Sequence, residues 1–162
     1  MQQTTFIPAS CSILTISDTR NLNTDKSGKL IQTFLEKAGH QVISRVVVAD
    51  DATLIAKKME ELVADNPFCL ITNGGTGIAK RDVTYEALFS TIHQEIPGFG
   101  ELFRMLSYEN VGSRAMVSRA FAGFTENGLL IFALPGSTNA CRLAMESLII
   151  PELPHLVAER EK

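Results

Sequence analysis

Apolar and polar residues follow one another along this chain in blocks that predict strands and amphipathic helices in turn. Residues 12–16 form a short apolar run typical of a buried strand, and a polar turn follows it. The next segment repeats apolar residues at helical spacing from Leu30 to Ala38, and Gly39 is a typical helix stop. A strand that leads into a helix is the repeating unit of an α/β protein.

The same unit recurs along the chain. Further strands are expected at residues 42–48, 68–71 and 129–134. The helical patterns that follow them contain Ile55, Met59 and Leu62; Leu88, Ile92 and Ile96 after an N-cap at Thr84; and Leu143, Leu148 and Ile149. Pro151 and Pro154 then set off a short terminal segment. Near-continuous apolar strands are typical of a sheet covered on both faces, so we predict a three-layer α/β/α sandwich with a mostly parallel, doubly wound sheet.

The stretch from residue 97 to residue 127 is less regular. Four of its apolar residues have helical spacing, namely Phe99, Leu102, Phe103 and Leu106. In one interpretation this stripe packs against the sheet, and in the other it forms a subunit contact or a partial lid over a site. A strand-rich insertion is expected near residues 120–128.

Length and composition predict a single domain. The chain has 162 residues, and its 45% hydrophobic content is enough for one sizeable core. We assign the domain to residues 10–154 and terminal extensions to residues 1–9 and 155–162.

The charge balance argues against nucleic acid and membranes as partners. The formal net charge is −3 at pH 7, and the sequence has no run of basic residues that would bind phosphate backbones or anionic lipid. The longest apolar stretch, residues 129–135, is far shorter than the roughly 20 residues that cross a bilayer. Met1–Thr5 lack the basic start of a signal peptide. We therefore expect a cytoplasmic protein with a small-molecule or protein partner.

Cysteine and histidine residues do not indicate a metal site. Cys11, Cys69 and Cys141 have no C-x-x-C spacing, and the three histidines are scattered. We expect reduced, buried thiols and no zinc site.

The run from Thr72 to Gly77 is the most informative polar segment. It follows an apolar strand and contains Gly74, Gly75 and Thr76. Because glycine has no Cβ, such a loop brings bare backbone N–H groups close to a ligand, and phosphate is the natural guest. Three glycines in four positions cost roughly 1 kcal/mol each relative to alanine, which a ligand-free turn would not need. The run matches neither G-x-x-x-x-G-K-S/T nor G-x-G-x-x-G.

A carboxylate follows this loop at Asp82, within Arg81-Asp82-Val83-Thr84. Its negative charge does not attract phosphate. We therefore expect Asp82 to hold Mg²⁺ or to orient a reacting group.

Parallel strands bring their carboxyl ends to one edge of a sheet, where ligands bind in α/β proteins. The loops expected at that edge contain Ser17-Asp18, Asp50-Asp51, Thr72 to Gly77 with Asp82, and Pro135 to Asn139. Each also has a purely structural interpretation. The acidic pair caps a helix, Asp18 forms an Asx turn, and Pro135-Gly136-Ser137 is strand-to-helix punctuation with Ser137 as the N-cap.

Several segments together resemble the MoaB/MogA family of molybdenum cofactor biosynthesis. They are Ile16 to Arg20, Gly74 to Gly77 with Arg81 to Thr84, Pro97 to Arg104, and Leu134 to Ser137. The likeness runs from about Ser10 to Leu153, and residues 101–109 and 133–138 are similar to the MoaB branch in particular.

The resemblance implies molybdopterin adenylyltransferase chemistry. In this reaction the terminal phosphate of molybdopterin attacks the α-phosphate of ATP, with Mg²⁺ as cofactor, and pyrophosphate leaves. The alternative is a protein of the same pathway that binds molybdopterin or a nucleotide without turnover. A similar domain also occurs in the larger competence-damage proteins.

The resemblance also implies roles for individual residues. Asp50 and Asp82 would be catalytic, Asp50 as a holder of Mg²⁺ or of nucleotide phosphates and Asp82 by orienting the pterin phosphate or the metal. The residues expected to bind substrate or nucleotide are Ser17, Asp18, Thr72, Gly74, Gly75, Thr76, Gly77, Glu101, Pro135, Gly136, Ser137, Thr138 and Asn139. The implied assembly is a homotrimer or a hexamer made of two trimers.

Overall fold

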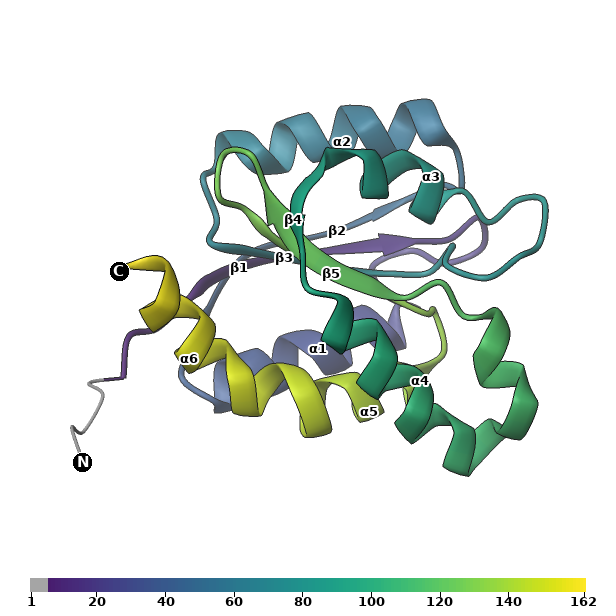
Figure 1. Ribbon diagram of the computed structural model, residues 1–162. Coiled ribbons are helices and arrows are strands. Elements are labelled where there is room, and N and C mark those ends of the chain that lie inside the picture. Colours follow the sequence, from purple (N-terminus) through teal and green to yellow (C-terminus); the bar gives the residue numbers. More distant parts are fainter. Residues whose placement is uncertain (1–5) are drawn as a thin grey trace.

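The computed structural model describes residues 6–162 and contains a six-stranded sheet with the strand order β2-β1-β3-β6-β5-β4 (Figure 1). The strands are β1 (Ser10–Ile16), β2 (Gln41–Val48), β3 (Cys69–Asn73), β4 (Ile92–Glu95), β5 (Phe121–Thr125) and β6 (Leu130–Leu134). β2, β1, β3 and β6 are parallel neighbours, whereas β5 is antiparallel to both β6 and β4. The prediction of a mostly parallel α/β sheet is confirmed.

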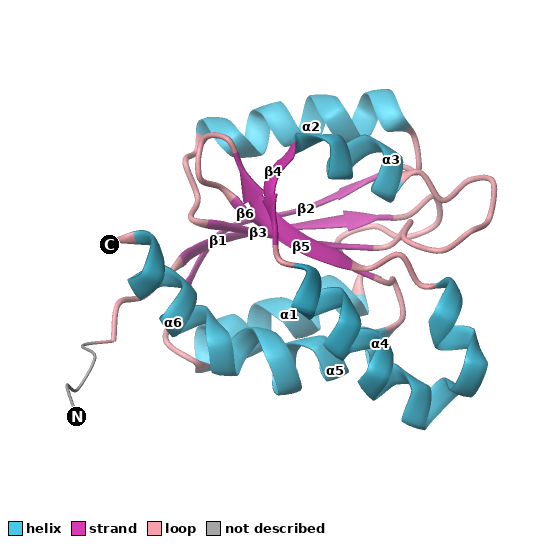
Figure 2. Cartoon of the chain, in the orientation of Figure 1, coloured by secondary structure: helices cyan, strands magenta, loops and turns pink. Residues whose placement is uncertain are grey.

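Helices cover both faces of the sheet, which confirms the three-layer sandwich (Figure 2). One layer contains α2 (Ala52–Ala64) and α3 (Thr84–Leu88). The other contains α1 (Lys26–Lys37), α4 (Pro97–Val111), α5 (Thr138–Ala144) and α6 (Ile150–Arg160). Short turns η1 (Phe89–Thr91), η2 (Gly112–Val117) and η3 (Met145–Ile149) complete the connections.

The central strands separate two hydrophobic cores. In β3, Ile71 belongs to the core beneath α1 and α5, whereas its neighbour Leu70 belongs to the core beneath α2. Both side chains are fully buried. Burial of such a side chain contributes about 1.5–3 kcal/mol, so strands that are apolar on both faces are stable only between two helical layers.

The prediction of one helix from Thr84 to Ile96 is wrong. α3 ends at Leu88, and Ile92–Glu95 form strand β4, which pairs with β5. The short apolar pattern is compatible with either structure, and the free edge of β5 decides the outcome because it offers hydrogen-bond partners. Thr84 is not the N-cap, a position that Val83 occupies.

The C-terminal prediction is also wrong. Instead of a short segment set off by prolines, α5 continues through the π turn η3 into α6, with Pro151 in its first turn and Pro154 inside it. An interior proline costs a helix about 3 kcal/mol. Leu153 and Val157 lie on the buried face of α6, and their burial contributes about 3–6 kcal/mol together, which outweighs that cost.

The irregular stretch forms α4, η2 and β5. Phe99 and Phe103 are buried in the core, which confirms the packing interpretation for these two residues. Leu102, by contrast, is 47% exposed. The expected strand near residues 120–128 is β5.

The expected N-terminal extension is only partly within the structure, because residues 1–5 lie outside the described part of the chain. Ala9 is buried, and its backbone N–H donates to His40 Nδ1 at 3.0 Å. In the described part, no helix has the length and apolar character of a transmembrane span.

Candidate active site

The carboxyl ends of four parallel strands meet at one edge of the sheet, as the sequence predicts. Thr15 of β1 is in register with Asn73 of β3, which is in register with Leu134 of β6. A Cβ added at Gly136 would lie 3.3 Å from Gly74 Cα. The loop after β6 therefore packs directly on the glycine loop after β3.

The glycine loop depends on the absence of side chains at two positions. Gly74 has φ +103° and Gly75 has φ +71°, a region that residues with a Cβ rarely adopt. A Cβ at Gly74 would lie 2.1 Å from the carbonyl oxygen of Ile16, and one at Gly75 would lie 2.1 Å from Thr84 Oγ1. Thr84 instead donates its hydroxyl to Gly74 O at 2.8 Å, which secures the turn.

Asp50 is joined to this loop from the end of β2. A Cβ at Gly75 would lie 3.2 Å from Asp50 Oδ1, and the Asp50 backbone N–H donates to Asp18 Oδ1 at 2.9 Å. Asp18 therefore organises the Asp50 turn, and the Asx-turn interpretation of Asp18 is wrong. Asp51 has the capping role expected of the acidic pair, because its Oδ1 accepts from Leu54 N at the start of α2.

The Asp50 carboxylate is held in a costly environment. Its Oδ1 is buried and has no hydrogen-bond partner among residues 6–162. Burial raises the pKa of Asp50, the negative charges of Asp18 and Asp82 raise it further, and the positive charge of Arg81 lowers it. A buried acceptor without a donor costs about 1–3 kcal/mol, so a charged ligand that pairs with this oxygen would relieve a cost already present.

Asp82 closes the far end of the glycine loop. Its Oδ2 accepts from Ala79 N at 2.9 Å, and its own N–H donates to Ala79 O at 2.9 Å. A Cβ at Gly77 would lie 2.8 Å from Asp82 Oδ2, so Gly77 gives this carboxylate room. Asp82 therefore shapes the loop and also adds negative charge near Asp50.

Other polar atoms at this edge share the condition of Asp50. Those that are buried without a hydrogen-bond partner in the described chain are Thr72 Oγ1, Asn73 Oδ1, Thr76 Oγ1 and Ser118 Oγ. Most buried polar atoms in folded proteins are paired, so a group of unpaired ones indicates a place for a ligand or for water. Thr72 and Thr76 are among the substrate-binding residues predicted from the sequence, whereas Asn73 and Ser118 are not.

The loop after β6 is positioned by residues from α1 and its approach. Gly136 O accepts from Arg20 Nη1 at 3.0 Å and from Ser27 Oγ at 2.8 Å. Thr138 Oγ1 lies 3.3 Å from the same Ser27 hydroxyl. Ser137 caps α5 by accepting from Ala140 N, which confirms its N-cap interpretation. Arg20 belongs to a segment that resembles the MoaB/MogA family, Ile16 to Arg20. Nothing in the sequence indicates a role for Ser27 at the site.

A buried polar network lies beneath the site. Asp25 is the N-cap of α1, and its Oδ2 accepts from Thr15 Oγ1 at 2.8 Å and from Arg45 Nη1 at 3.0 Å. Asn73 Nδ2 also donates to Thr15 Oγ1 at 2.9 Å. The network ties β1, β2, β3 and α1 together just below the loops.

The remaining expected residues contribute less to this arrangement. Ser17 Oγ accepts from the backbone N–H groups of Thr19 and Arg20, so it shapes the turn after β1. Asn139 is exposed in α5. Glu101 is exposed on α4, and its side chain makes no hydrogen bond or ion pair within residues 6–162, so the structure does not join it to the loops.

No His, Cys, Asp or Glu cluster among the described residues is arranged as a ready metal cage. The thiols are free and buried, as expected. Burial raises the pKa of Cys141 to about 12, so this thiol stays protonated and inert.

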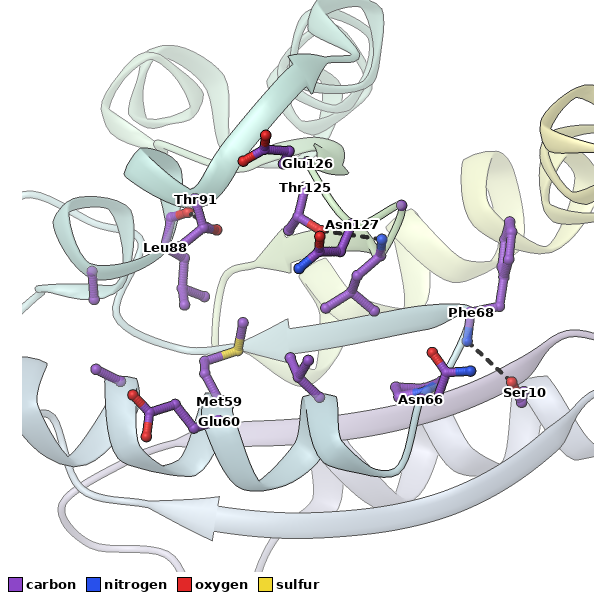
Figure 3. A pocket seen from close by; sticks show the side chains of 16 residues that line it. Ser10, Met59, Glu60, Asn66, Phe68, Leu88, Thr91, Thr125, Glu126 and Asn127 are labelled. Carbon is purple, nitrogen blue, oxygen red and sulfur yellow. Dashed lines mark hydrogen bonds between the residues drawn. The ribbon is translucent and has the colours of Figure 1, made fainter.

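A cavity lies at the opposite, amino edge of the sheet (Figure 3). It has a volume of about 650 Å³ and runs between α2, α3 and the turn from β5 to β6. Met59 and Leu88 are among its apolar lining residues, and Glu60 and Glu126 are its acidic ones. None of the residues expected to bind substrate lines it.

Known proteins resemble the chain over nearly its whole length. Residues 12–155 match the family described as "Probable molybdopterin binding domain". The chain is 51% identical over 151 residues to molybdenum cofactor biosynthesis protein B of Bacillus anthracis, covering 92% of this chain and 89% of that protein. The corresponding protein of Bacillus subtilis is 47% identical over 154 residues, with 94% and 90% coverage.

Solved structures show the same fold. A crystal structure of molybdenum cofactor biosynthesis protein B superposes with a TM-score of 0.89 at 46% identity and covers 99% of both chains. The tungsten cofactor synthesizing protein MoaB from Pyrococcus furiosus superposes with a TM-score of 0.87 at 31% identity and covers 96% of this chain and 98% of its own. The chain therefore belongs to the MoaB family of molybdenum cofactor biosynthesis proteins.

Proposed function

We propose that this protein is a molybdopterin adenylyltransferase of the cytoplasm, which uses Mg²⁺ and ATP to adenylylate molybdopterin with release of pyrophosphate. Family membership supports the pathway and the pterin ligand. The observation that carries the proposal is the Asp50 carboxylate, whose buried Oδ1 has no partner in the described chain and lies beside Gly75 of the glycine loop.

The reaction asks for positioning more than for covalent chemistry. An oxygen of the molybdopterin phosphate attacks the α-phosphorus of ATP, the bond from that phosphorus to the α,β-bridging oxygen breaks, and pyrophosphate leaves with the bond's electron pair. Two loops that pack against each other, one at Gly74 and one at Gly136, suit two phosphate-bearing substrates that must meet.

The oxygen donors at this edge fit Mg²⁺. This ion keeps several waters and binds through one or two carboxylates together with substrate phosphates, so it needs no cage made by the protein alone. Asp50 would hold it through the unpaired Oδ1, with Asp82 as the neighbouring carboxylate. When bound, Mg²⁺ neutralises charge on the transferring phosphates.

A cation of the chain is also available at the site. Arg81 is exposed, makes no hydrogen bond or ion pair within residues 6–162, and is close enough to Asp50 to lower its pKa. Its guanidinium is suited to phosphate oxygens, so we assign it to the leaving pyrophosphate.

We also propose that the protein is a homotrimer or a hexamer, following the family resemblance. α4 and η2 expose Met105 at 60%, Tyr108 at 64% and Met116 at 80%, which supports an interface on this surface. Phe103 is in the monomer core, so a substitution there would disturb the fold itself. Met105→Asp therefore tests the interface. We expect Met105→Asp to lower the mass of the oligomer measured by light scattering. An unchanged mass would exclude this surface as the subunit interface.

The direct test is incubation of the purified protein with molybdopterin, ATP and Mg²⁺, followed by mass spectrometry of the pterin product. We expect adenylylated molybdopterin and pyrophosphate in equal amounts. Tight binding of molybdopterin without this product would refute the proposed adenylyltransferase activity. It would support the alternative, a binding protein of the same pathway.

A further inference from the structure

Arg119 makes an unusual concentration of contacts with the loop that carries Asp82. Its backbone N–H donates to Thr76 O at 2.8 Å, and its Nε donates to Gly77 O at 2.9 Å. Nη2 donates to Asp82 O at 3.1 Å. One residue in the segment just before β5 thus holds the loop at its beginning and at its end, across more than 30 residues of sequence.

The rest of the guanidinium is engaged with the helix that follows the loop. It forms an ion pair with Glu86 and lies over the Tyr85 ring, with Cζ 5.2 Å from the ring centroid. Nε, Nη1 and Nη2 all donate to protein acceptors. Arg119 therefore differs from Arg81, whose guanidinium has no partner in the described chain.

The loop has few other means of holding its shape. Between Thr76 and Val83, its own hydrogen bonds are the pair that joins Ala79 and Asp82. α3, which follows, is only five residues long, and its cap residue Val83 makes no side-chain capping bond. Helices this short depend on tertiary contacts for stability.

We propose that Arg119 is a positioning residue that sets the place of Asp82 and the Thr76–Asp82 loop relative to Asp50. The inference rests on the proposed function for its effect on turnover, whereas its effect on the loop stands apart from any reaction. Arg119 acts through backbone carbonyls of the loop, and its own charge is neutralised by Glu86.

Hydrogen–deuterium exchange on the ligand-free protein tests the loop directly. The reporters are the hydrogen-bonded amides of Ala79 and Asp82. We expect Arg119→Met to speed exchange in peptides covering residues 76–84 by about tenfold or more, because its loss frees both ends of the loop. Unchanged exchange there would overturn the proposal.

Arg160→Met is the matched control. Arg160 also lies over an aromatic ring, with Cζ 4.3 Å from the Phe124 centroid, and donates to a side-chain oxygen of Gln94. Its removal should leave exchange at residues 76–84 within about twofold of the wild-type rate. An equal rise in both variants would mean general loosening of the fold and would overturn the proposal.

Two milder variants keep the test decisive if Arg119→Met fails to fold. Arg119→Lys retains the charge but cannot reach two carbonyls and Glu86 at once, so we expect faster loop exchange here too. Glu86→Gln removes only the ion pair, and we expect exchange within about twofold of wild type. Faster loop exchange in Glu86→Gln than in Arg119→Lys would assign the effect to the ion pair and contradict the role of the carbonyl contacts.

Steady-state kinetics distinguishes positioning from substrate binding. For Arg119→Met we expect kcat to fall about 10- to 100-fold while KM for ATP stays within about threefold, because a displaced loop misaligns bound substrates. A raised KM with normal loop exchange would identify Arg119 as a phosphate ligand and overturn the proposal. If the wild type forms no product, the proposed function fails, and the exchange result still decides the role of Arg119.

Discussion

The loops at the carboxyl edge of the sheet and the cavity at its amino edge differ in how completely their polar side chains are paired. At the carboxyl edge, the buried oxygens of Asp50, Thr72 and Thr76 lack partners in the described chain. At the amino edge, the cavity of about 650 Å³ is bounded by paired backbone groups, such as Phe68 N with Ser10 O and Leu130 N with Phe68 O.

The cavity at the amino edge is therefore not the better candidate for the functional site, despite its volume of about 650 Å³. Unpaired buried groups cost stability, and they persist at functional sites because a ligand needs them. None of the side chains lining the amino-edge cavity has a buried polar atom without a partner in the described chain, although Asn66 and Gly128 there also have positive φ. Substitutions at both edges test whether the reaction takes place only at the carboxyl edge.

Asp50→Asn should reduce turnover most, by about 1000-fold or more, because it removes the carboxylate that we propose to hold Mg²⁺ while keeping the shape of the side chain. The rate of pyrophosphate release checks it. Asp51→Asn is the matched control, since asparagine caps a helix as well as aspartate does and turnover should be unchanged. Equal losses in both variants would contradict the separate roles of these neighbours.

Asp25→Ala should destabilise the fold by about 3–5 kcal/mol, because it leaves Arg45 and Thr15 without their buried partner. Urea unfolding measures the change. Glu61→Ala removes the exposed ion pair with Lys58 and should leave the free energy of unfolding almost unchanged. A small effect of Asp25→Ala would mean that the network beneath the site does not support it.

Gly75→Ala should cost about 1–3 kcal/mol and lower turnover, because its φ is +71° and the new Cβ would meet Thr84 Oγ1. Thermal unfolding and pyrophosphate release check the two effects. Gly98→Ala is the control, since no atom lies within 4 Å of its added Cβ and the position is in the first turn of α4. There we expect unchanged stability or a gain of up to about 1 kcal/mol.

Asp50→Asn should also raise the free energy of unfolding at pH 7 by a small amount, because solvent screens much of the charge on this partly exposed group. The folded pKa of Asp50 is raised by burial, so the ionised carboxylate destabilises the fold above that pKa. The cost disappears as pH falls below the unfolded value of about 4. Chemical denaturation of both proteins from pH 3 to pH 8 should show the gain only at the upper end, and a pH-independent gain would contradict this cause.

Glu126→Gln should change the least. The residue lines the amino-edge cavity, so turnover should stay within about twofold and stability within about 0.5 kcal/mol. The pyrophosphate assay and urea unfolding used above apply here as well. A clear loss of turnover would show that the amino edge takes part in the reaction.

The sequence predicts those parts of the site that depend on local chemistry. Consecutive glycines after an apolar strand indicate the loop at Gly74 and Gly75, and two adjacent aspartates after another strand indicate a helix cap, whereas the role of Asp50 comes from the family resemblance. The parallel sheet then brings these loops to one edge. Each of these inferences uses residues that are neighbours in the chain.

The rest depends on contacts between distant segments. Arg119 reaches Gly77 across 42 residues, and Ser27 reaches Gly136 across 109. A serine or an arginine in a polar segment carries no mark of such a partner. The helix prediction after Thr84 is wrong for the same reason. Pairing with the edge of β5 makes Ile92–Glu95 a strand, and the local apolar pattern does not distinguish a strand from a helix there.

Glycine amide signals provide the most direct test of which edge is the site. Mg²⁺ and ATP are titrated into ¹⁵N-labelled protein, and the NMR signals of Gly74, Gly75, Gly77 and Gly136 at the carboxyl edge are compared with that of Gly128 at the amino-edge cavity. We predict that the first four signals shift and that Gly128 does not. A shift of Gly128 with unchanged signals at the carboxyl edge would contradict the account.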